Sequence, residues 1–373
     1  MKDSQMSDFR SLIRPEINDL PDYNAGLALD RFRATYGIDC VAKLDSNENP
    51  HGPSPRAIAA IEAAATGVAR YPDAGTLALR QAIGTGYGLP AERVVMGNGS
   101  EDLIGAIFRA VLRPGDHVVT ICPSFGLHEF GALACGATVS KLPFNEDWSF
   151  PIDGIVDALA DKPRVLMFSS PSNPAGPAIT SDGFDRILAG LDPETLFVFD
   201  EAYVEFLSDD AKFNALERLE TSNLPWISLR TFSKAYGLAG VRVGYALCAN
   251  EVLAKSLLKT RNPFGVNALA VVAAHEAFAD VDHLEHSTRA TMAERGRLYE
   301  EMTKRGYSAA PSHTNFLFFD CGESGAGFAE KLRHKGVLIK GWLEQPYENW
   351  ARVTIGTPEQ NNAFLNALDS LKG

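Results

Sequence analysis

The sequence predicts an α/β protein with a large, mostly parallel sheet sandwiched by helices and a smaller α+β lobe at the C-terminal end. Two observations carry this prediction. From residue 43 to residue 265, short apolar runs alternate with helical patterns, which is typical of parallel sheets. Beyond that segment, long helical patterns from Ala268 to Arg305 precede further strand-like runs. We therefore divide the chain into an N-terminal arm (1–42), a large domain (43–265) and a small C-terminal domain (266–373).

The arm is expected to be helical around Ala28–Tyr36, and the first buried strand of the large domain that we identify is Val94–Met96. That strand leads into the turn G-N-G-S-E-D, where a helical pattern opens. A glycine turn that opens a helix offers backbone N–H groups and a positive dipole end to an anion. The Ser100 hydroxyl and the Glu101 amide are therefore candidate phosphate donors, although a glycine turn alone is weak evidence.

Two further apolar strands each end in polar residues. Val165–Phe168 leads into P-S-N-P-A-G, which contains Asn173, and Leu196–Phe199 ends in Asp200, three residues before Tyr203. Ligands of open α/β sheets lie beyond the carboxyl ends of strands, so these side chains are expected near a ligand. A carboxylate there can keep a pyridine nitrogen protonated. Turn chemistry, helix capping and core packing explain the same residues equally well when each is taken alone.

The strand-like run Trp226–Leu229 delivers the chain to T-F-S-K-A-Y-G-L-A-G-V-R-V-G, which contains Lys234. An amine at a strand end can form a Schiff base with an aldehyde cofactor. Thr231, Ser233 and Arg242 supply hydroxyl donors and a planar cation, which suit a dianionic phosphate. A lysine beside a phosphate site indicates pyridoxal phosphate, whereas S-K alone is more often a solvated turn.

The last strands expected are Phe316–Phe319, Val337–Ile339 and Arg352–Ile355, in the small domain. A chain of 373 residues with a net charge of -12 can bury a large core and is unsuited to nucleic acid, whose phosphates require clustered cations. We expect a cytoplasmic protein with reduced thiols and no membrane span, because its cysteines are scattered and its N-terminus is polar. No C-x-x-C spacing suggests a metal site, and we predict none.

Seven motifs appear in one order along nearly the whole chain. They are K-L-D-S-N-E-N-P-H-G-P-S-P, R-Y-P-D, G-N-G-S-E-D, P-S-N-P-A-G, F-D-E-A-Y, T-F-S-K-A-Y-G-L-A-G-V-R and A-R-V-T-I-G-T. In this order they resemble the fold-type-I pyridoxal-phosphate-dependent aminotransferases (class I/II), and within them the histidinol-phosphate aminotransferase group. The resemblance implies a site between the two domains.

The resemblance also implies roles for individual residues. Lys234 would hold pyridoxal 5'-phosphate covalently, Asp200 would pair with its pyridine nitrogen, and Tyr203 would act beside them as a third catalytic residue. Further cofactor-binding residues would be Ser100, Glu101, Phe125, Asn173, Thr231, Ser233 and Arg242. Phe125 takes the place of a ring-stacking aromatic residue that is often tyrosine. Tyr71 would reach the phosphate from a neighbouring subunit, which implies a homodimer with shared active sites.

On the substrate side the resemblance assigns Arg352 to the substrate carboxylate, and we add Asn173, Tyr23 and Lys340 as substrate-binding candidates. Three features depart from the pattern of the histidinol-phosphate group. Ser172 stands where a second asparagine is usual, Glu101-Asp102 reverses a familiar acidic pair, and Lys340 stands where an arginine is expected. A lysine is a point charge without the bidentate grip of an arginine on phosphate, so this departure bears on the substrate.

The function that these features favour is a two-stage amino transfer with small-molecule partners, an amino donor and a 2-oxo acid. The first candidate is histidinol-phosphate:2-oxoglutarate transamination, a step of histidine biosynthesis. The alternative is an aromatic amino-acid aminotransferase with the same core. A pyridoxal-phosphate-dependent decarboxylase or lyase fits less well. A non-catalytic regulator fits least, because a DNA-binding segment is absent from the sequence and the charge is unsuitable.

Overall fold

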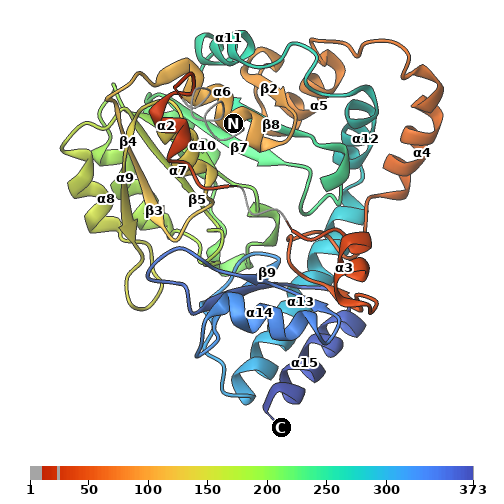
Figure 1. The fold of residues 1–373 in the computed structure, drawn as a ribbon. Helices are drawn as coiled ribbons and strands as arrows, with labels where there is room; N and C mark the ends of the chain where they lie inside the picture. The colour runs from red at the N-terminus through yellow and green to blue at the C-terminus, as the bar shows by residue number, and fades with distance from the viewer. Residues whose placement is uncertain (1–10, 23–25, 373) are drawn as a thin grey trace, which may run out of the picture.

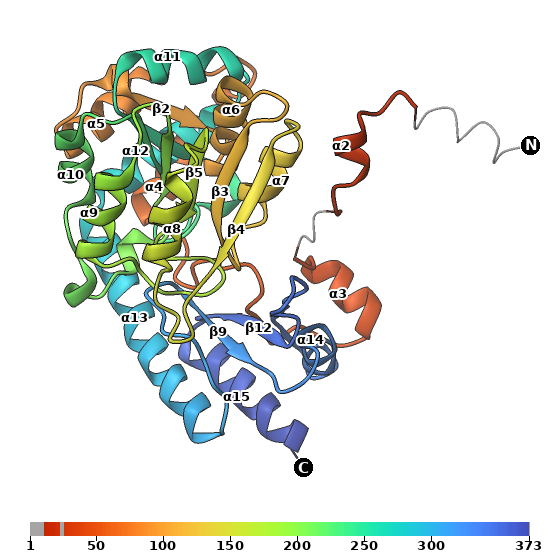
Figure 2. The same ribbon diagram turned by 90° about the vertical axis from the view of Figure 1, so that its left-hand side faces the viewer.

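The computed structural model describes residues 11–22 and 26–372. Figure 1 shows one large lobe above a smaller lobe that holds the C-terminus. We call residues 48–280 the large lobe, and residues 29–47 together with 281–372 the small lobe. Figure 2 shows the short helix α2 (Pro15–Asn18) outside the body of the large lobe, beyond α7 and β4.

The large lobe is built on a seven-stranded sheet with the order β2-β8-β7-β6-β5-β3-β4. The strands are β2 (Val94–Gly97), β3 (His117–Cys122), β4 (Thr138–Pro143), β5 (Val165–Ser169), β6 (Leu196–Asp200), β7 (Trp226–Thr231) and β8 (Gly244–Cys248). Only β8 runs against its neighbours, so the expected mostly parallel sheet is confirmed. Because β2 and β7 are both antiparallel to β8, the carboxyl ends of β2, β5, β6 and β7 meet at one edge.

Helices cover both faces of this sheet. They are α4 (Pro55–Ala64), α5 (Leu77–Tyr87), α6 (Ser100–Val111), α7 (Leu127–Leu133), α8 (Ile152–Leu159), α9 (Ser181–Gly190), α10 (Ala215–Ser222), α11 (Glu251–Thr260) and α12 (Ala268–Ala279). Side chains of α6, α7 and α11 share one apolar cluster with the sheet, whereas those of α4, α5, α8, α9, α10 and α12 share another. The sheet is therefore the middle layer of three.

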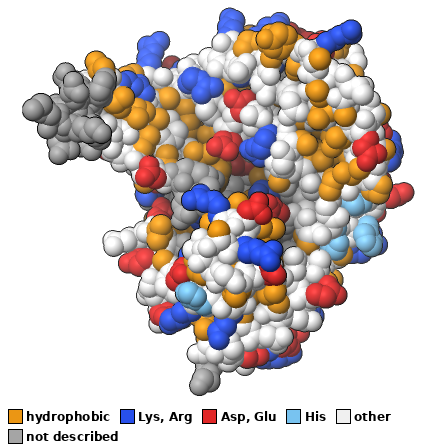
Figure 3. All heavy atoms as spheres, turned by 45° about the vertical axis from the view of Figure 1, so that its right-hand side comes forward, with side chains coloured by type: hydrophobic (Ala, Val, Ile, Leu, Met, Phe, Trp, Pro, Cys, Tyr) orange, Lys and Arg blue, Asp and Glu red, His pale blue; other side chains and the backbone are white. Residues whose placement is uncertain are grey.

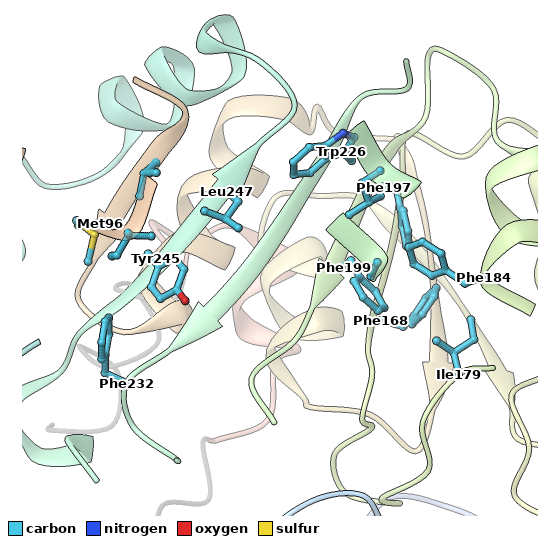
Figure 4. Close-up of a cluster of buried hydrophobic side chains, with 14 of the residues drawn as sticks. Met96, Phe168, Ile179, Phe184, Phe197, Phe199, Trp226, Phe232, Tyr245 and Leu247 are labelled. Carbon is cyan, nitrogen blue, oxygen red and sulfur yellow. The ribbon is translucent and has the colours of Figure 1, made fainter. Parts of the chain in front are cut away.

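Strand β6 is apolar on both faces, and helices cover both of them. Its alternate residues enter different clusters, with Phe197 and Phe199 on one face and Val198 on the other. Figure 4 shows Phe168 and Phe184 gathered with both phenylalanines on the first face, and the rings of Phe184 and Phe199 lie 5.0 Å apart. Burying one such side chain contributes about 1.5–3 kcal/mol. A run that is apolar at every position thus suits a strand with helices on both sides.

The small lobe contains an antiparallel sheet in the order β11-β12-β9 and a separate parallel pair, β1 with β10. Its strands are β1 (Ala42–Lys43), β9 (Phe316–Asp320), β10 (Val337–Leu338), β11 (Lys340–Gly341) and β12 (Trp350–Thr354). Its helices are α3 (Leu29–Tyr36), α13 (Val281–Lys304), α14 (Gly325–Arg333) and α15 (Pro358–Lys372). Within the described ranges, no helix is long and apolar enough to cross a membrane.

The N-terminal segment packs with the small lobe. Tyr36 of α3 donates to both carboxylate oxygens of Glu330, at 3.0 and 2.9 Å, and β1 pairs with β10. Ala42 and Leu44 lie in the apolar cluster of this lobe. Our division of the chain began the large domain at residue 43, whereas this pairing joins residues 42–44 to the small lobe. The pairing involves residues almost 300 positions apart, which a local pattern cannot reveal.

Candidate active site

The carboxyl ends of β2, β5, β6 and β7 border a cavity of about 660 Å³ between the two lobes. Figure 3 shows the surface hollowed between the lobes, with acidic and basic side chains at its rim. Most of the residues singled out in the sequence line this cavity. They are Ser100, Glu101, Phe125, Asn173, Asp200, Tyr203, Thr231, Ser233, Lys234, Arg242, Lys340 and Arg352.

Lys234 follows β7, and its amine faces the cavity. Its Nζ donates to the backbone oxygen of Ser46 at 3.4 Å and lies 5.9 Å from the ring centre of Tyr203. Burial, and then the positive charge of Arg352, lower the pKa of this amine to about 8. An amine with this pKa has an uncharged, nucleophilic fraction near neutral pH.

Asp200 is the last residue of β6 and is held by a buried histidine. Its Oδ1 accepts the backbone N–H of Ala202 at 3.1 Å, and its Oδ2 lies 3.2 Å from Nε2 of His128. The other ring nitrogen of His128 lies 3.1 Å from Oγ of Ser124. Both Asp200 and His128 are buried. A carboxylate held in this way keeps one orientation toward the cavity.

His128 was not expected at the site, because it lies outside the seven motifs. His128 belongs to α7, four residues after Ser124, so a helix start after C-P-S-F places the two side chains together. That spacing was the only local signal. The contact with Asp200 joins residues 72 positions apart and follows from the pairing of β3 with β5 and of β5 with β6.

Tyr203 and Asn173 are each tied to the small lobe. The hydroxyl of Tyr203 accepts from Nδ2 of Asn47 at 2.9 Å, and Oδ1 of Asn173 accepts from Arg352 at 2.7 Å. The backbone N–H of Asn47 donates to the hydroxyl of Thr354 at 2.9 Å. Asn47 was also missed by the sequence analysis, although it lies within the motif K-L-D-S-N-E-N-P. These contacts bring donors from both lobes to one part of the cavity.

Another part of the cavity has groups that suit an anion. It lies at the N-terminus of the 12-residue helix α6, where Gly99 has a φ of +82°. A side chain at Gly99 would lie 2.6 Å from Nη2 of Arg242, so the glycine leaves room for that guanidinium. Arg242 also approaches Ser233 Oγ at 3.4 Å and Glu101 at 3.5 Å. Hydroxyls, a guanidinium and a helix N-terminus together fit a dianionic phosphate.

A second group of cations lies in the small lobe. Lys340 of β11 pairs in register with Arg352 of β12, and both line the cavity. Arg352 also donates to the backbone oxygen of Asp45 at 2.9 Å. Burial, and then the charge of Arg352, lower the pKa of Lys340 to about 8. Two neighbouring cations suit a ligand with one or two negative charges.

Of the remaining two predicted residues, one lies elsewhere and the other is not described. Tyr71 is 82% exposed and does not line the cavity of its own chain; its ring lies 4.7 Å from that of Phe264. Tyr23 lies outside the described residues. The proposed roles of both residues therefore stay predictions, and the role of Tyr71 requires a second chain.

Comparison with known proteins agrees with this geometry. Residues 40–368 match the family model of class I and II aminotransferases. Histidinol-phosphate aminotransferase 1 of Mesorhizobium japonicum is 41% identical over 98% of this chain and 100% of its own length. Histidinol-phosphate aminotransferase 3 of Rhizobium meliloti is 44% identical, with 96% and 97% covered.

Solved structures of aminotransferases are also similar to this chain. The histidinol-phosphate aminotransferase of Sinorhizobium meliloti, in complex with pyridoxal-5'-phosphate, has a TM-score of 0.88 with 28% identity and covers 97% of this chain and 98% of its own. The aspartate aminotransferase of Thermus thermophilus with maleate has a TM-score of 0.81 at 19% identity, and 96% and 99% are covered. The latter shows the fold alone.

Proposed function

Because this chain belongs to the class I and II aminotransferase family, we propose that it transfers the amino group of histidinol phosphate to 2-oxoglutarate, with pyridoxal 5'-phosphate as cofactor. The observation that carries the proposal is the position of Lys234, whose amine has a lowered pKa. It lies in a cavity that also has the groups suited to an anion and the cations Lys340 and Arg352. The names of the relatives support the choice of substrate.

The residues of the cavity fit this cofactor. Ser100, Thr231, Ser233 and Arg242 would hold its phosphate, and Gly99 leaves the space that this arrangement needs. Asp200 would hold the proton of the ring nitrogen, with Phe125 against the ring. When bound, pyridoxal phosphate supplies an aldehyde that takes up amino groups and a ring that withdraws electrons from the substrate α-carbon.

The side chains of this protein would perform the proton transfers. Nζ of Lys234 takes the proton from the α-carbon of the amino donor and later returns a proton, first as base and then as acid. The Asp200 carboxylate would face the ring nitrogen, and His128 fixes its orientation. Tyr203 and Asn173 offer a hydroxyl and an amide to the phenolic oxygen of the ring.

The cations of the small lobe would bind the anionic end of either donor. Histidinol phosphate has a phosphate where glutamate has its α-carboxylate, so one site must accept both. The planar fork of Arg352 fits either oxyanion, and Lys340 adds a second charge for the dianionic phosphate. Lys340 thereby stands in for the arginine expected at this position.

We also propose a homodimer in which Tyr71 completes the phosphate site of the partner subunit. In support, Tyr71 is exposed beside Phe264, and Ile58, Val68 and Leu77 are also exposed apolar residues. Figure 3 shows hydrophobic side chains gathered on the large-lobe part of one face. Such a patch is typical of an interface. The cytoplasmic location stays a prediction.

A second function, aromatic amino-acid transamination, is favoured by the aromatic lining of the cavity, where Phe125, Phe130 and Trp342 lie. The two functions are separated by measuring kcat/KM for histidinol phosphate, phenylalanine, tyrosine and histidine with 2-oxoglutarate as acceptor. The proposal predicts that histidinol phosphate is used best. Higher kcat/KM for phenylalanine or tyrosine would establish the second function instead.

A further inference from the structure

One wall of the cavity is not needed by the cofactor or by the anion site. It is lined by Glu129, Phe130, Lys141, Trp342, Leu343 and Glu344. Glu129 belongs to α7 and Lys141 to β4, both in the large lobe, whereas Glu344 follows β11 in the small lobe. We call Glu129, Lys141 and Glu344 the ionic wall. It spans the gap between the lobes.

The ionic wall contains one ammonium and two carboxylates. Nζ of Lys141 donates to Oε2 of Glu129 and to Oε1 of Glu344, each at 3.0 Å. Burial opposes the charge of this lysine, but the hydrogen bonds to Glu344 and Glu129 outweigh that effect and raise its pKa. The wall therefore carries one excess negative charge. Its three side chains are 22–31% exposed, so water and salt screen this charge in part.

Glu344 is held from several sides. Its Oε1 also accepts from the thiol of Cys122 at 3.3 Å, and its Oε2 accepts from the indole N–H of Trp342 at 3.4 Å. Burial, and then Glu344, raise the pKa of Cys122 to about 12, so its thiol stays a neutral donor. An ammonium has three N–H donors and two carboxylates offer about eight acceptor positions. The wall thus keeps both a donor and acceptors for a ligand.

With the amine of each donor near Lys234 and its anionic group at Arg352, its third substituent would face this remaining wall. The α-carbon of each amino donor presents its amine to Lys234 and its anionic group to Arg352. The remaining substituent is an imidazolylmethyl group in histidinol phosphate and a carboxyethyl group in glutamate. The first carries a ring N–H donor and the second a carboxylate acceptor. A single wall must therefore accept groups of opposite hydrogen-bonding character.

We propose that the ionic wall binds the side chain of either amino donor: Glu344 and Glu129 accept from the ring N–H of histidinol phosphate, and Lys141 donates to the side-chain carboxylate of glutamate. This inference rests on the proposed function. It differs from the anion site, where Arg352 would bind the anionic group of either donor and Lys340 would add a charge for the phosphate.

The test uses the holoenzyme and the variants Glu344→Gln and Lys141→Met. Each amino donor is mixed with enzyme in the absence of a 2-oxo acid, so that only the first half of the transamination occurs. The change in cofactor absorbance gives its rate, and the dependence of this rate on donor concentration gives a second-order rate constant for each donor. Glu344→Gln should lower the ratio of the constants, histidinol phosphate over glutamate, by about tenfold, equivalent to one charge-assisted hydrogen bond. Lys141→Met should raise the same ratio by about tenfold.

The matched control is Glu323→Gln, which removes a carboxylate of the same lobe that pairs with Lys331 at the surface. It should leave the ratio unchanged. If Lys141→Met does not fold, Lys141→Gln removes the charge and serves the same comparison. A calorimetric titration of histidinol phosphate into Lys234→Ala, with and without Glu344→Gln, should show a weaker Kd in the double variant.

Two results would overturn the inference. The first is an unchanged ratio in both variants, and the second is a ratio that moves in the same direction in both, as expected of a purely structural contact between the lobes. Failure of the proposed function is recognised separately, because the unmutated enzyme would then show no half-reaction with histidinol phosphate. In that case the loss of glutamate reactivity in Lys141→Met still decides the carboxylate part of the inference.

Discussion

Replacing Lys234 should stabilise the cofactor-free protein, because the same burial that activates the amine makes its charged form costly. The pKa of Lys234 falls from 10.5 to about 8. At about 1.4 kcal/mol for each pKa unit, this corresponds to about 3.5 kcal/mol of destabilisation when the amine is charged. Because the side chain also faces the cavity, water screens part of this cost. We expect Lys234→Met to raise the free energy of unfolding by about 1–3 kcal/mol at pH 7.

The pH dependence separates this effect from better packing by methionine. The lysine has a lower pKa in the folded chain than in the unfolded chain, so the folded state loses its proton first. The penalty is therefore fully present below pH 8 and is relieved as the pH rises from about 8 to 10.5. The difference between variant and unmutated protein should shrink over this window, whereas a packing gain would not depend on pH.

The assay is urea unfolding of both cofactor-free proteins at pH 7 and pH 10, with equal m-values as a check. Lys255→Met is the control, because this lysine is 64% exposed and pairs only with the helix neighbour Glu251 among the contacts seen in the described chain. It should change stability by less than about 0.5 kcal/mol at either pH. A Lys234→Met protein no more stable than the unmutated one at pH 7, or a difference independent of pH, would refute the reasoning.

Three further predictions concern the site. His128→Phe should lower kcat by an amount equivalent to about 1.5–3 kcal/mol of activation free energy, because Asp200 loses a buried hydrogen-bond partner. Near-normal turnover of this variant would argue against a positioning role for His128. A dimer mixed from Lys234→Ala and Tyr71→Phe parents should recover one intact site in a cofactor titration; a monomer, or no recovered site, would exclude the shared site. Lys340→Met should raise the KM for histidinol phosphate about tenfold at pH 7. This difference should fade by pH 9, because Lys340 loses its charge as the pH rises through about 8, while the KM for glutamate stays unchanged.

The elements of the sheet that carry the site were predictable because their signals are local. Apolar runs such as Leu196–Phe199 fit strands buried on both faces, and β6 has these residues at its core. Strands β3 and β4 were not identified. The residues of β4 are exposed or half-buried at the edge of the sheet, and its sequence T-V-S-K-L-P has no continuous apolar run. Strand β8 follows the lysine motif directly, and its reversal depends on pairing with β2 and β7.

The site residues that belong to sequence motifs were predictable. Asp200 and Lys234 each stand at the carboxyl end of a predicted strand, and the rule for open α/β sheets brings them to one cavity. His128 and the ionic wall were not predictable, because their contacts depend on how helices and lobes pack. Glu344 meets Lys141 across 203 positions, and neither belongs to a motif.

The central claim is that this cavity holds pyridoxal phosphate on Lys234 and transfers amino groups. The most direct measurement is reduction of the purified protein with borohydride, followed by peptide mapping. We predict one phosphopyridoxyl label, on the peptide that contains Lys234, and no label after prior incubation with excess histidinol phosphate, because the amino donor displaces the lysine. A label on another lysine, or none at all with added cofactor, would contradict the account.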